Sequence, residues 1–80
     1  MAHITYYGDL RSLTAKNEES IQAETLTELL NTVGSLYGKN AKKAAKSSLI
    51  VVNNEKVLSI RKVKLDDLSQ VGFFPMCGGG

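Results

Sequence analysis

The fold of this chain is decided by residues 25–38, which read TLTELLNTVGSLYG. Thr25 is a favourable N-cap, Glu28 three residues later completes a capping-box pattern, and Gly38 is a suitable C-terminal stop. Gly34 costs a helix interior about 1 kcal/mol relative to alanine, which indicates close packing against a neighbour. The apolar side chains recur at the spacing of one helical face: Leu26, Leu29, Leu30, Val33, Leu36 and Tyr37. We therefore predict one long amphipathic helix.

Short apolar runs on either side of this helix predict strands. Residues 3–7 alternate, with Ile4 and Tyr6 expected on one face and Thr5 and Tyr7 on the other. The other expected strands are 19–23, which could form a hairpin with the first, then 49–52, 56–60 and 71–74. The continuous apolar run 49–52 is typical of a strand buried on both faces.

The intervening segments complete the expected architecture. Residues 39–48 are expected to form a second short helix or a loop, 53–55 a turn, and 61–70 a charged connection. Pro75 ends the last strand because it removes a donor from the hydrogen-bond ladder. The resulting order is strand, strand, helix, strand, short strand, strand. It predicts an α+β protein in which a mixed sheet packs on one main helix.

Length and composition indicate a single domain that folds by packing alone. The chain has 80 residues, of which 42% are hydrophobic. Cys77 is the only cysteine, so an intrachain disulfide is impossible, as is typical of an intracellular protein. No apolar run approaches the roughly 20 residues that span a membrane, and residues 1–4 do not resemble a signal peptide. We expect a cytoplasmic protein without membrane association.

The net charge is small but unevenly distributed. The total of +2 divides into −3 over residues 1–38, with two basic and five acidic side chains, and +5 over residues 39–80, with eight basic and three acidic ones. Lys39, Lys42, Lys43 and Lys46 share one face if their segment is helical. A solvated surface is the favoured interpretation, and docking of an acidic partner is the alternative. Nucleic-acid binding is not expected, because no aromatic or arginine side chains are interleaved with these lysines.

Side chains that usually perform catalysis or bind metals are too few to form a self-contained active site. His3 is the only histidine and Cys77 the only cysteine, so a zinc site of the usual ligand count is excluded within one chain. A Cys-His nucleophilic pair would require the first strand to meet the tail, and it lacks an evident third group. Asp66 and Asp67 are adjacent in a connection, where we expect turn residues.

The chain ends in an unusual sequence, FFPMCGGG over residues 73–80. Glycines have no Cβ, so a tail of Gly78, Gly79 and Gly80 can enter a narrow channel and present its terminal carboxylate as a chemical handle. The alternative is an ordinary frayed terminus. The terminal carboxylate is ionised and unreactive at neutral pH, so chemistry at Gly80 would need activation by another protein.

Four segments together resemble a known family. They are the opening ITYYGDLR over residues 4–11, TLTELL over 25–30, VVN over 51–53, and VGFFP over 71–75 before the terminal Gly79-Gly80. The chain is similar over essentially its whole length to the small, ubiquitin-like subunit of molybdopterin synthase, a β-grasp sulfur carrier. The resemblance implies a β-grasp domain over residues 1–76 and a flexible tail over 77–80.

The chain departs from this family at two places. It has Asp67-Leu68-Ser69 where the family usually has Asp-Gly-Asp, and Met76 replaces a second proline. Leucine does not adopt positive φ cheaply, so the turn that contains Leu68 must be built differently.

The resemblance also implies a function. An E1-like activating enzyme would use ATP to adenylate Gly80, and a sulfur donor would then convert it to a thiocarboxylate. The large subunit of molybdopterin synthase would take up this sulfur for molybdenum or tungsten cofactor synthesis. The chain itself would be a carrier without catalytic side chains, bound metal or bound cofactor, with Gly78 and Gly79 as its tail. Alternatives are a ubiquitin-like protein modifier, a carrier for tRNA thiolation, and a purely structural β-grasp interaction domain.

The aromatic side chains near the tail are candidates for partner docking. If Val71 and Phe73 face the core, strand alternation places Phe74 on the other face, and Tyr7 follows by the same argument. With Pro75 they form the expected docking residues, because exposed aromatic groups beside a functional tail suggest an interface. The alternative is that Phe74 packs under residues 39–48. Cys77 is interpreted as a tolerated small residue, with a persulfide relay as the minority hypothesis.

Overall fold

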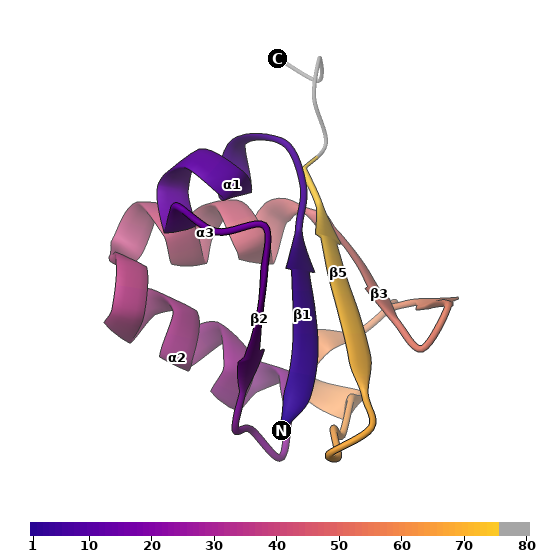
Figure 1. Cartoon of the computed structure of the whole chain (residues 1–80). Coiled ribbons are helices and arrows are strands. Elements are labelled where there is room, and N and C mark those ends of the chain that lie inside the picture. The colour runs from indigo at the N-terminus through magenta and orange to yellow at the C-terminus, as the bar shows by residue number, and fades with distance from the viewer. Residues whose placement is uncertain (76–80) are drawn as a thin grey trace.

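The computed structural model describes residues 1–75, which form a five-stranded mixed sheet with helices on one side (Figure 1). The strand order is β2-β1-β5-β3-β4, in which β5 is parallel to β1 and antiparallel to β3. The elements are β1 Ala2–Tyr6, α1 Asp9–Thr14, β2 Glu18–Ile21, α2 Leu26–Tyr37, α3 Lys39–Ser47, β3 Leu49–Val52, β4 Glu55–Lys56, a 3-10 helix Ile60–Lys62, and β5 Gln70–Phe74. None of the helices in this part of the chain is long and apolar enough to cross a membrane.

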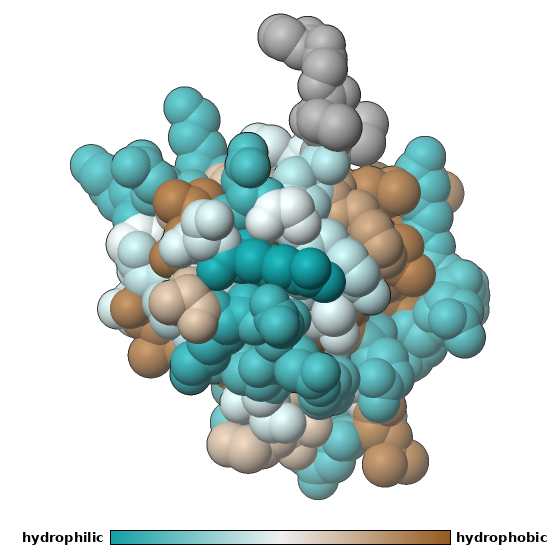
Figure 2. All heavy atoms as spheres, turned by 45° about the horizontal axis from the view of Figure 1, so that its top comes forward, coloured by the Kyte–Doolittle hydropathy of each residue, from teal (hydrophilic) through white to brown (hydrophobic). Residues whose placement is uncertain are grey.

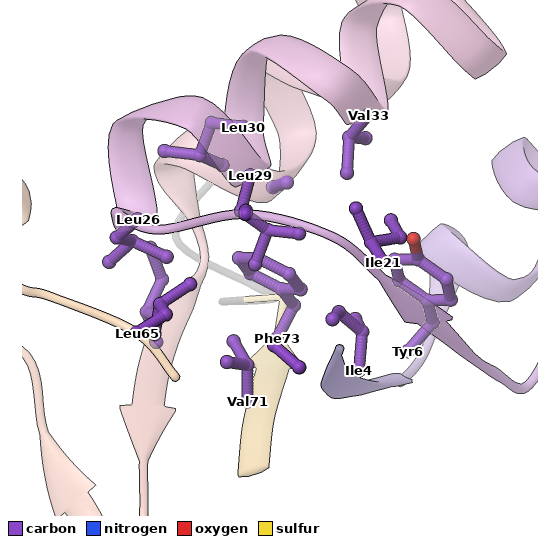
Figure 3. Close-up of a cluster of buried hydrophobic side chains, with 14 of the residues drawn as sticks. Ile4, Tyr6, Ile21, Leu26, Leu29, Leu30, Val33, Leu65, Val71 and Phe73 are labelled. Carbon is purple, nitrogen blue, oxygen red and sulfur yellow. The ribbon is translucent and has the colours of Figure 1, made fainter. Parts of the chain in front are cut away.

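The core lies between the sheet and α2 (Figure 3). Ile4 is paired in register with Val71, and Tyr6 with Phe73, so each pair reaches the same face of two neighbouring strands. All four residues are at most 2% exposed, which confirms the alternation predicted for β1 and β5. The rings of Tyr6 and Phe73 are 6.2 Å apart and nearly parallel. From α2, the core receives Leu26, Leu29, Leu30 and Val33.

Helix α2 has the ends that the sequence predicts. The Thr25 hydroxyl accepts a hydrogen bond from the Glu28 amide at 3.1 Å, and Gly38, with φ 100°, follows the last residue. The close packing predicted at Gly34 is confirmed, because a Cβ built there would lie 3.0 Å from Lys42 Cδ. Helix α3 therefore crosses α2 at Gly34, and the segment 39–48 is mainly helical rather than a loop.

The first connection differs from the expected hairpin. Strands β1 and β2 are antiparallel neighbours, but α1 lies between them in the chain. Gly8, with φ 57°, turns the chain out of β1, and Leu10 and Thr14 then fix α1 to the core as buried residues. One short turn of helix with two anchoring residues gives too little periodicity to be read from sequence.

The third and fourth strands also differ from expectation. Only Ile50 of β3 is buried, so this strand is not buried on both faces. The predicted strand over residues 56–60 is wrong: β4 covers Glu55–Lys56, and Leu58 is 90% exposed. Asn53 and Asn54 both have positive φ, which makes a two-residue hairpin turn that pairs β4 immediately with β3.

The turn before β5 is built from side-chain hydrogen bonds. Asp66 Oδ1 accepts from the Leu68 amide at 2.9 Å, and Ser69 Oγ accepts from the Asp66 amide at 2.9 Å. Within residues 1–75, the non-glycine residues with positive φ are Ala15, Asn53 and Asn54, so Leu68 avoids that conformation. The structure therefore confirms the turn predicted at Asp66. It also confirms that this turn is built differently from the glycine-containing turn usual in the family.

Candidate partner-docking surface at the end of strand β5

The face of the sheet opposite the helices carries the candidate site. Thr5 and Val51 are both paired in register with Gly72 of the strand between them, and Leu49 is paired with Phe74. These positions alternate with core residues, so they face away from α2. All of them are half-buried. This open face is therefore more apolar than an ordinary solvated sheet surface.

An aromatic pair dominates this face. The rings of Tyr7 and Phe74 stack 4.2 Å apart with an interplanar angle of 10°. Gly72 makes this arrangement possible, because a Cβ there would lie only 2.9 Å from Phe74 Cε2 and 3.7 Å from Tyr7 Cε2. Phe74 thus packs on Tyr7 and not under residues 39–48, and the two rings are half-buried by each other.

Pro75 rests on the turn that leaves β1. A Cβ at Gly8 would lie 3.3 Å from Pro75 Cγ, and Gly8 has φ 57°. A side chain at Gly8 would therefore be strained by the backbone conformation and would crowd the proline. The end of β5 is thus held between the first turn of the chain and the aromatic pair.

Arg11 adds a positive charge beside the aromatic pair. Its Cζ lies 5.5 Å from the centroid of the Tyr7 ring, within the range of a cation–π interaction. Its Nε donates to the Tyr6 carbonyl oxygen at 3.0 Å, which fixes the guanidinium. We call the set of Tyr7, Arg11, Gly72, Phe74 and Pro75 the aromatic surface.

The aromatic surface adjoins a shallow hollow and not an enclosed ligand site. The hollow has a volume of about 180 Å³ and is lined by Thr5, Tyr7, Val51, Asn54, Gln70, Val71, Gly72 and Phe74. Small-molecule pockets usually measure about 300–1,000 Å³. Figure 2 shows brown, hydrophobic surface at the upper right, where β3 and the end of β5 lie. This geometry suits contact with a protein partner.

The structure describes some of the expected site residues and not others. Tyr7, Phe74 and Pro75 lie together at the end of β5, as the sequence predicts. The tail residues Gly78, Gly79 and Gly80, together with Cys77, lie outside the described residues.

Two members of the aromatic surface and one contact of His3 were not found by sequence reasoning. Arg11 follows Tyr7 by four residues, a spacing that carries meaning only once α1 is known. Gly72 could be found only from the rings that cover it. His3 Nε2 lies 2.9 Å from Glu18 Oε1, a contact between β1 and β2. No group of three His, Cys, Asp or Glu side chains within residues 1–75 could hold a metal ion.

A cluster of polar side chains around Glu19 joins β1, β2 and α2. Sequence reasoning did not identify this cluster. The hydroxyls of Tyr6 and Tyr37 both donate to Glu19 Oε2, and Lys16 Nζ lies 3.3 Å from Oε1. Burial alone would raise the pKa of Glu19, but these three donors together hold it below its ordinary value. Burial and the adjacent Glu19 carboxylate raise the pKa of Tyr6 and of Tyr37. The cluster fixes the sheet to the main helix.

The five-stranded mixed sheet on one main helix is the β-grasp fold of ubiquitin-like proteins. The candidate site on this fold is the aromatic surface at the end of the last strand. The model of the ThiS family matches residues 4–80, and the chain belongs to the ThiS family. A search of curated protein sequences found no match.

Solved structures confirm the fold. Small archaeal modifier protein 1 from Methanosarcina acetivorans has a TM-score of 0.81 at 16% identity, covering 99% of this chain and 95% of that one. A complex of subunits 1 and 2 of molybdopterin-converting factor from Helicobacter pylori gives 0.71 at 19% identity, with 99% and 97% covered. Urm1 from Sulfolobus solfataricus gives 0.67 at 19% identity, with 92% and 99% covered. The predicted membership among ubiquitin-like sulfur carriers is thus confirmed.

Proposed function

We propose that this chain is a sulfur carrier for molybdopterin synthesis whose reactive group is the Gly80 carboxylate. An E1-like activating enzyme would adenylate Gly80, and the large subunit of a molybdopterin synthase would receive the sulfur. A cytoplasmic location, where ATP is available, belongs to the same proposal. The chain binds no cofactor of its own in this scheme, and the aromatic surface serves both partners in turn.

The chemistry needs only a carboxylate and a slim tail from this chain. A carboxylate oxygen of Gly80 attacks the α-phosphorus of ATP, and pyrophosphate leaves. A sulfur nucleophile at the oxidation level of hydrosulfide then attacks the acyl carbon and expels AMP, which leaves a thiocarboxylate. The thiocarboxylate sulfur attacks a carbon of the pterin precursor and displaces an oxygen leaving group from it, and hydrolysis of the resulting thioester restores the Gly80 carboxylate and leaves the sulfur on the pterin. Gly78 and Gly79 offer no side chain that would obstruct a narrow active-site channel.

One observation carries the proposal. The ThiS family match extends through residue 80 and therefore includes the terminal diglycine, whereas a purely structural domain would have no need of it. The aromatic surface supports the same interpretation, because it includes Pro75, the last described residue before the tail. The Helicobacter pylori match supports a second subunit as partner, since that structure is a complex of subunits 1 and 2.

The test is to follow sulfur to Gly80. The protein is incubated with its cognate activating enzyme, ATP and a sulfur source, and its C-terminal peptide is fragmented by mass spectrometry. Fragmentation is essential, because oxidation of Met76 or Cys77 adds nearly the same mass as replacing oxygen by sulfur. We expect sulfur on the Gly80 carbonyl and ATP–pyrophosphate exchange that disappears when Gly79 and Gly80 are deleted. An unmodified Gly80 without exchange would refute the proposal.

A second candidate function is that of a protein modifier. The structural similarity to small archaeal modifier protein 1, with a TM-score of 0.81, suggests it. Both functions begin with adenylation of Gly80, so they differ only in the final acceptor. Isopeptide-linked conjugates in native cells, lost on deletion of Gly79 and Gly80, would favour the modifier. A carrier for tRNA thiolation would instead be recognised by loss of thiolated tRNA on the same deletion.

A further inference from the structure

A groove on the helical side of the molecule brings together three positive charges from two elements. It lies where α2, α3 and the 3-10 helix meet, and its volume is about 350 Å³. Lys42 and Lys46 line it from α3, and Arg61 lines it from the 3-10 helix. Ile60 and Leu30 supply apolar lining, whereas no acidic or aromatic side chain is part of the lining.

Lys42 is held in place at this groove before any partner arrives. Its aliphatic stem packs over Gly34, where a Cβ would meet Lys42 Cδ at 3.0 Å and Cβ at 3.3 Å. Its Nζ donates to Asn31 Oδ1 at 2.8 Å. An ammonium that is already ordered loses less side-chain entropy on binding than a free surface lysine. Gly34 therefore allows the two helices to cross and also leaves room for the aliphatic stem of Lys42.

The three charges of this groove are not neutralised within the described chain. The ion pairs of residues 1–75 are Met1 with Asp67, His3 with Glu18, and Lys16 with Glu19, and none involves the groove. All three cations come from residues 39–80, the half of the sequence that carries +5, whereas α2 contributes only uncharged residues to the lining. The three cations therefore give the groove a locally positive potential.

We propose that this groove binds an acidic segment of a protein partner, with carboxylates at Lys42, Lys46 and Arg61 and one aliphatic side chain against Ile60. A protein segment fits better than nucleic acid, because the lining offers an aliphatic patch and no aromatic ring for base stacking. Helices α2 and α3 cover the face of the sheet opposite the aromatic surface (Figure 1). A partner in the groove therefore leaves the aromatic surface free for a second protein.

The test uses the full chain and a short fluorescein-labelled peptide rich in Glu with a single Leu, followed by fluorescence anisotropy at low salt. The groove variant combines Lys42→Met, Lys46→Gln and Arg61→Gln, in which Met preserves the stem over Gly34. Each exposed charge pair contributes a factor of about two to three, so we expect affinity to fall about tenfold or more. Circular dichroism melting checks that the variant folds.

A matched control removes the same charge elsewhere. Lys56→Gln, Lys62→Gln and Lys64→Gln together also lower the net charge from +2 to −1, and these side chains are exposed and outside the groove lining. We expect the control to lose less than about threefold in affinity. Equal loss in both variants would mean diffuse attraction and would overturn the proposal. The proposal would also be overturned if a short RNA bound more tightly than the peptide and lost its affinity in the groove variant. Sulfur loading of Gly80 should be unchanged in the groove variant, so this test is independent of the proposed function.

Discussion

Replacing Gly72 by alanine should separate partner binding from folding. The new Cβ would lie 2.9 Å from Phe74 Cε2, closer than non-bonded atoms approach, so the ring must leave its stacked position on Tyr7. Loss of the aromatic stack costs about 0.5–1.5 kcal/mol. Alanine in place of glycine within a strand returns about 0.5–1 kcal/mol through the entropy of the unfolded chain. We therefore expect the free energy of unfolding to change by less than about 1 kcal/mol.

Binding should respond much more than stability. The displaced Phe74 ring would change the shape of the aromatic surface, and a well-packed aromatic group at the centre of an interface is commonly worth about 2 kcal/mol or more. We expect the dissociation constants for the activating enzyme and the large subunit to rise at least about tenfold in isothermal titration calorimetry. Urea unfolding and near-ultraviolet circular dichroism would report stability and the ring pair.

Gly34→Ala is the matched control, because it places the same methyl group on the helical side of the molecule. Its Cβ would meet the flexible stem of Lys42, so stability should change by about 1 kcal/mol or less and binding at the aromatic surface should be retained. Wild-type affinity of Gly72→Ala with a lost ring signal would refute the view that partners recognise the stacked rings. Global unfolding of Gly72→Ala would refute the expectation that the cost of the lost stacking and the gain from the unfolded-chain entropy nearly cancel.

Three further predictions follow from other residues. Phe74→Ala should weaken the partner complex while the protein stays folded, and unfolding or normal binding in titration calorimetry would contradict this. Glu19→Gln should lower the free energy of unfolding by about 1–3 kcal/mol, because the hydroxyls of Tyr6 and Tyr37 lose a charged acceptor. Since folding lowers the pKa of Glu19, its stabilisation is complete above the unfolded value and is lost as pH falls through the folded one, so acid titration of wild type should show a loss that Glu19→Gln lacks. Cys77→Ser should leave sulfur transfer to the acceptor unchanged, and a loss of transfer would favour the relay hypothesis.

The periodic elements were predictable because their signals are local. Helix α2 carries its cap, its apolar face and its stop within one continuous stretch, and β1 and β5 each alternate over their buried residues. The β-grasp topology came from the family resemblance, because periodicity does not specify the order of strands. The position of Tyr7 and Phe74 on the face opposite the core followed from alternation alone, and their docking role stays a prediction.

The unpredicted features depend on contacts between distant parts of the chain. Gly72 is required because the Phe74 ring lies too close to leave room for a Cβ, and Arg11 faces Tyr7 only because a short helix follows β1. The sequence predicts only a strand at Glu19, whereas in the structure its carboxylate accepts hydrogen bonds from Tyr6 and Tyr37 of two other elements. Such long-range partners leave no pattern in a single sequence.

The position of β5 has a consequence for the order of synthesis and folding. Without residues 70–74 the sheet consists of two unconnected pairs, β2 with β1 and β3 with β4, because β5 is the strand that joins them. The non-local pairing of β5 with β1 cannot form until almost all of the described chain has left the ribosome. The segment that leads to the tail is therefore also the segment that completes the domain. Under the proposed function, a chain interrupted before residue 70 would lack both the finished sheet and Gly80, so partners would meet the Gly80 carboxylate only on a molecule that can complete its sheet.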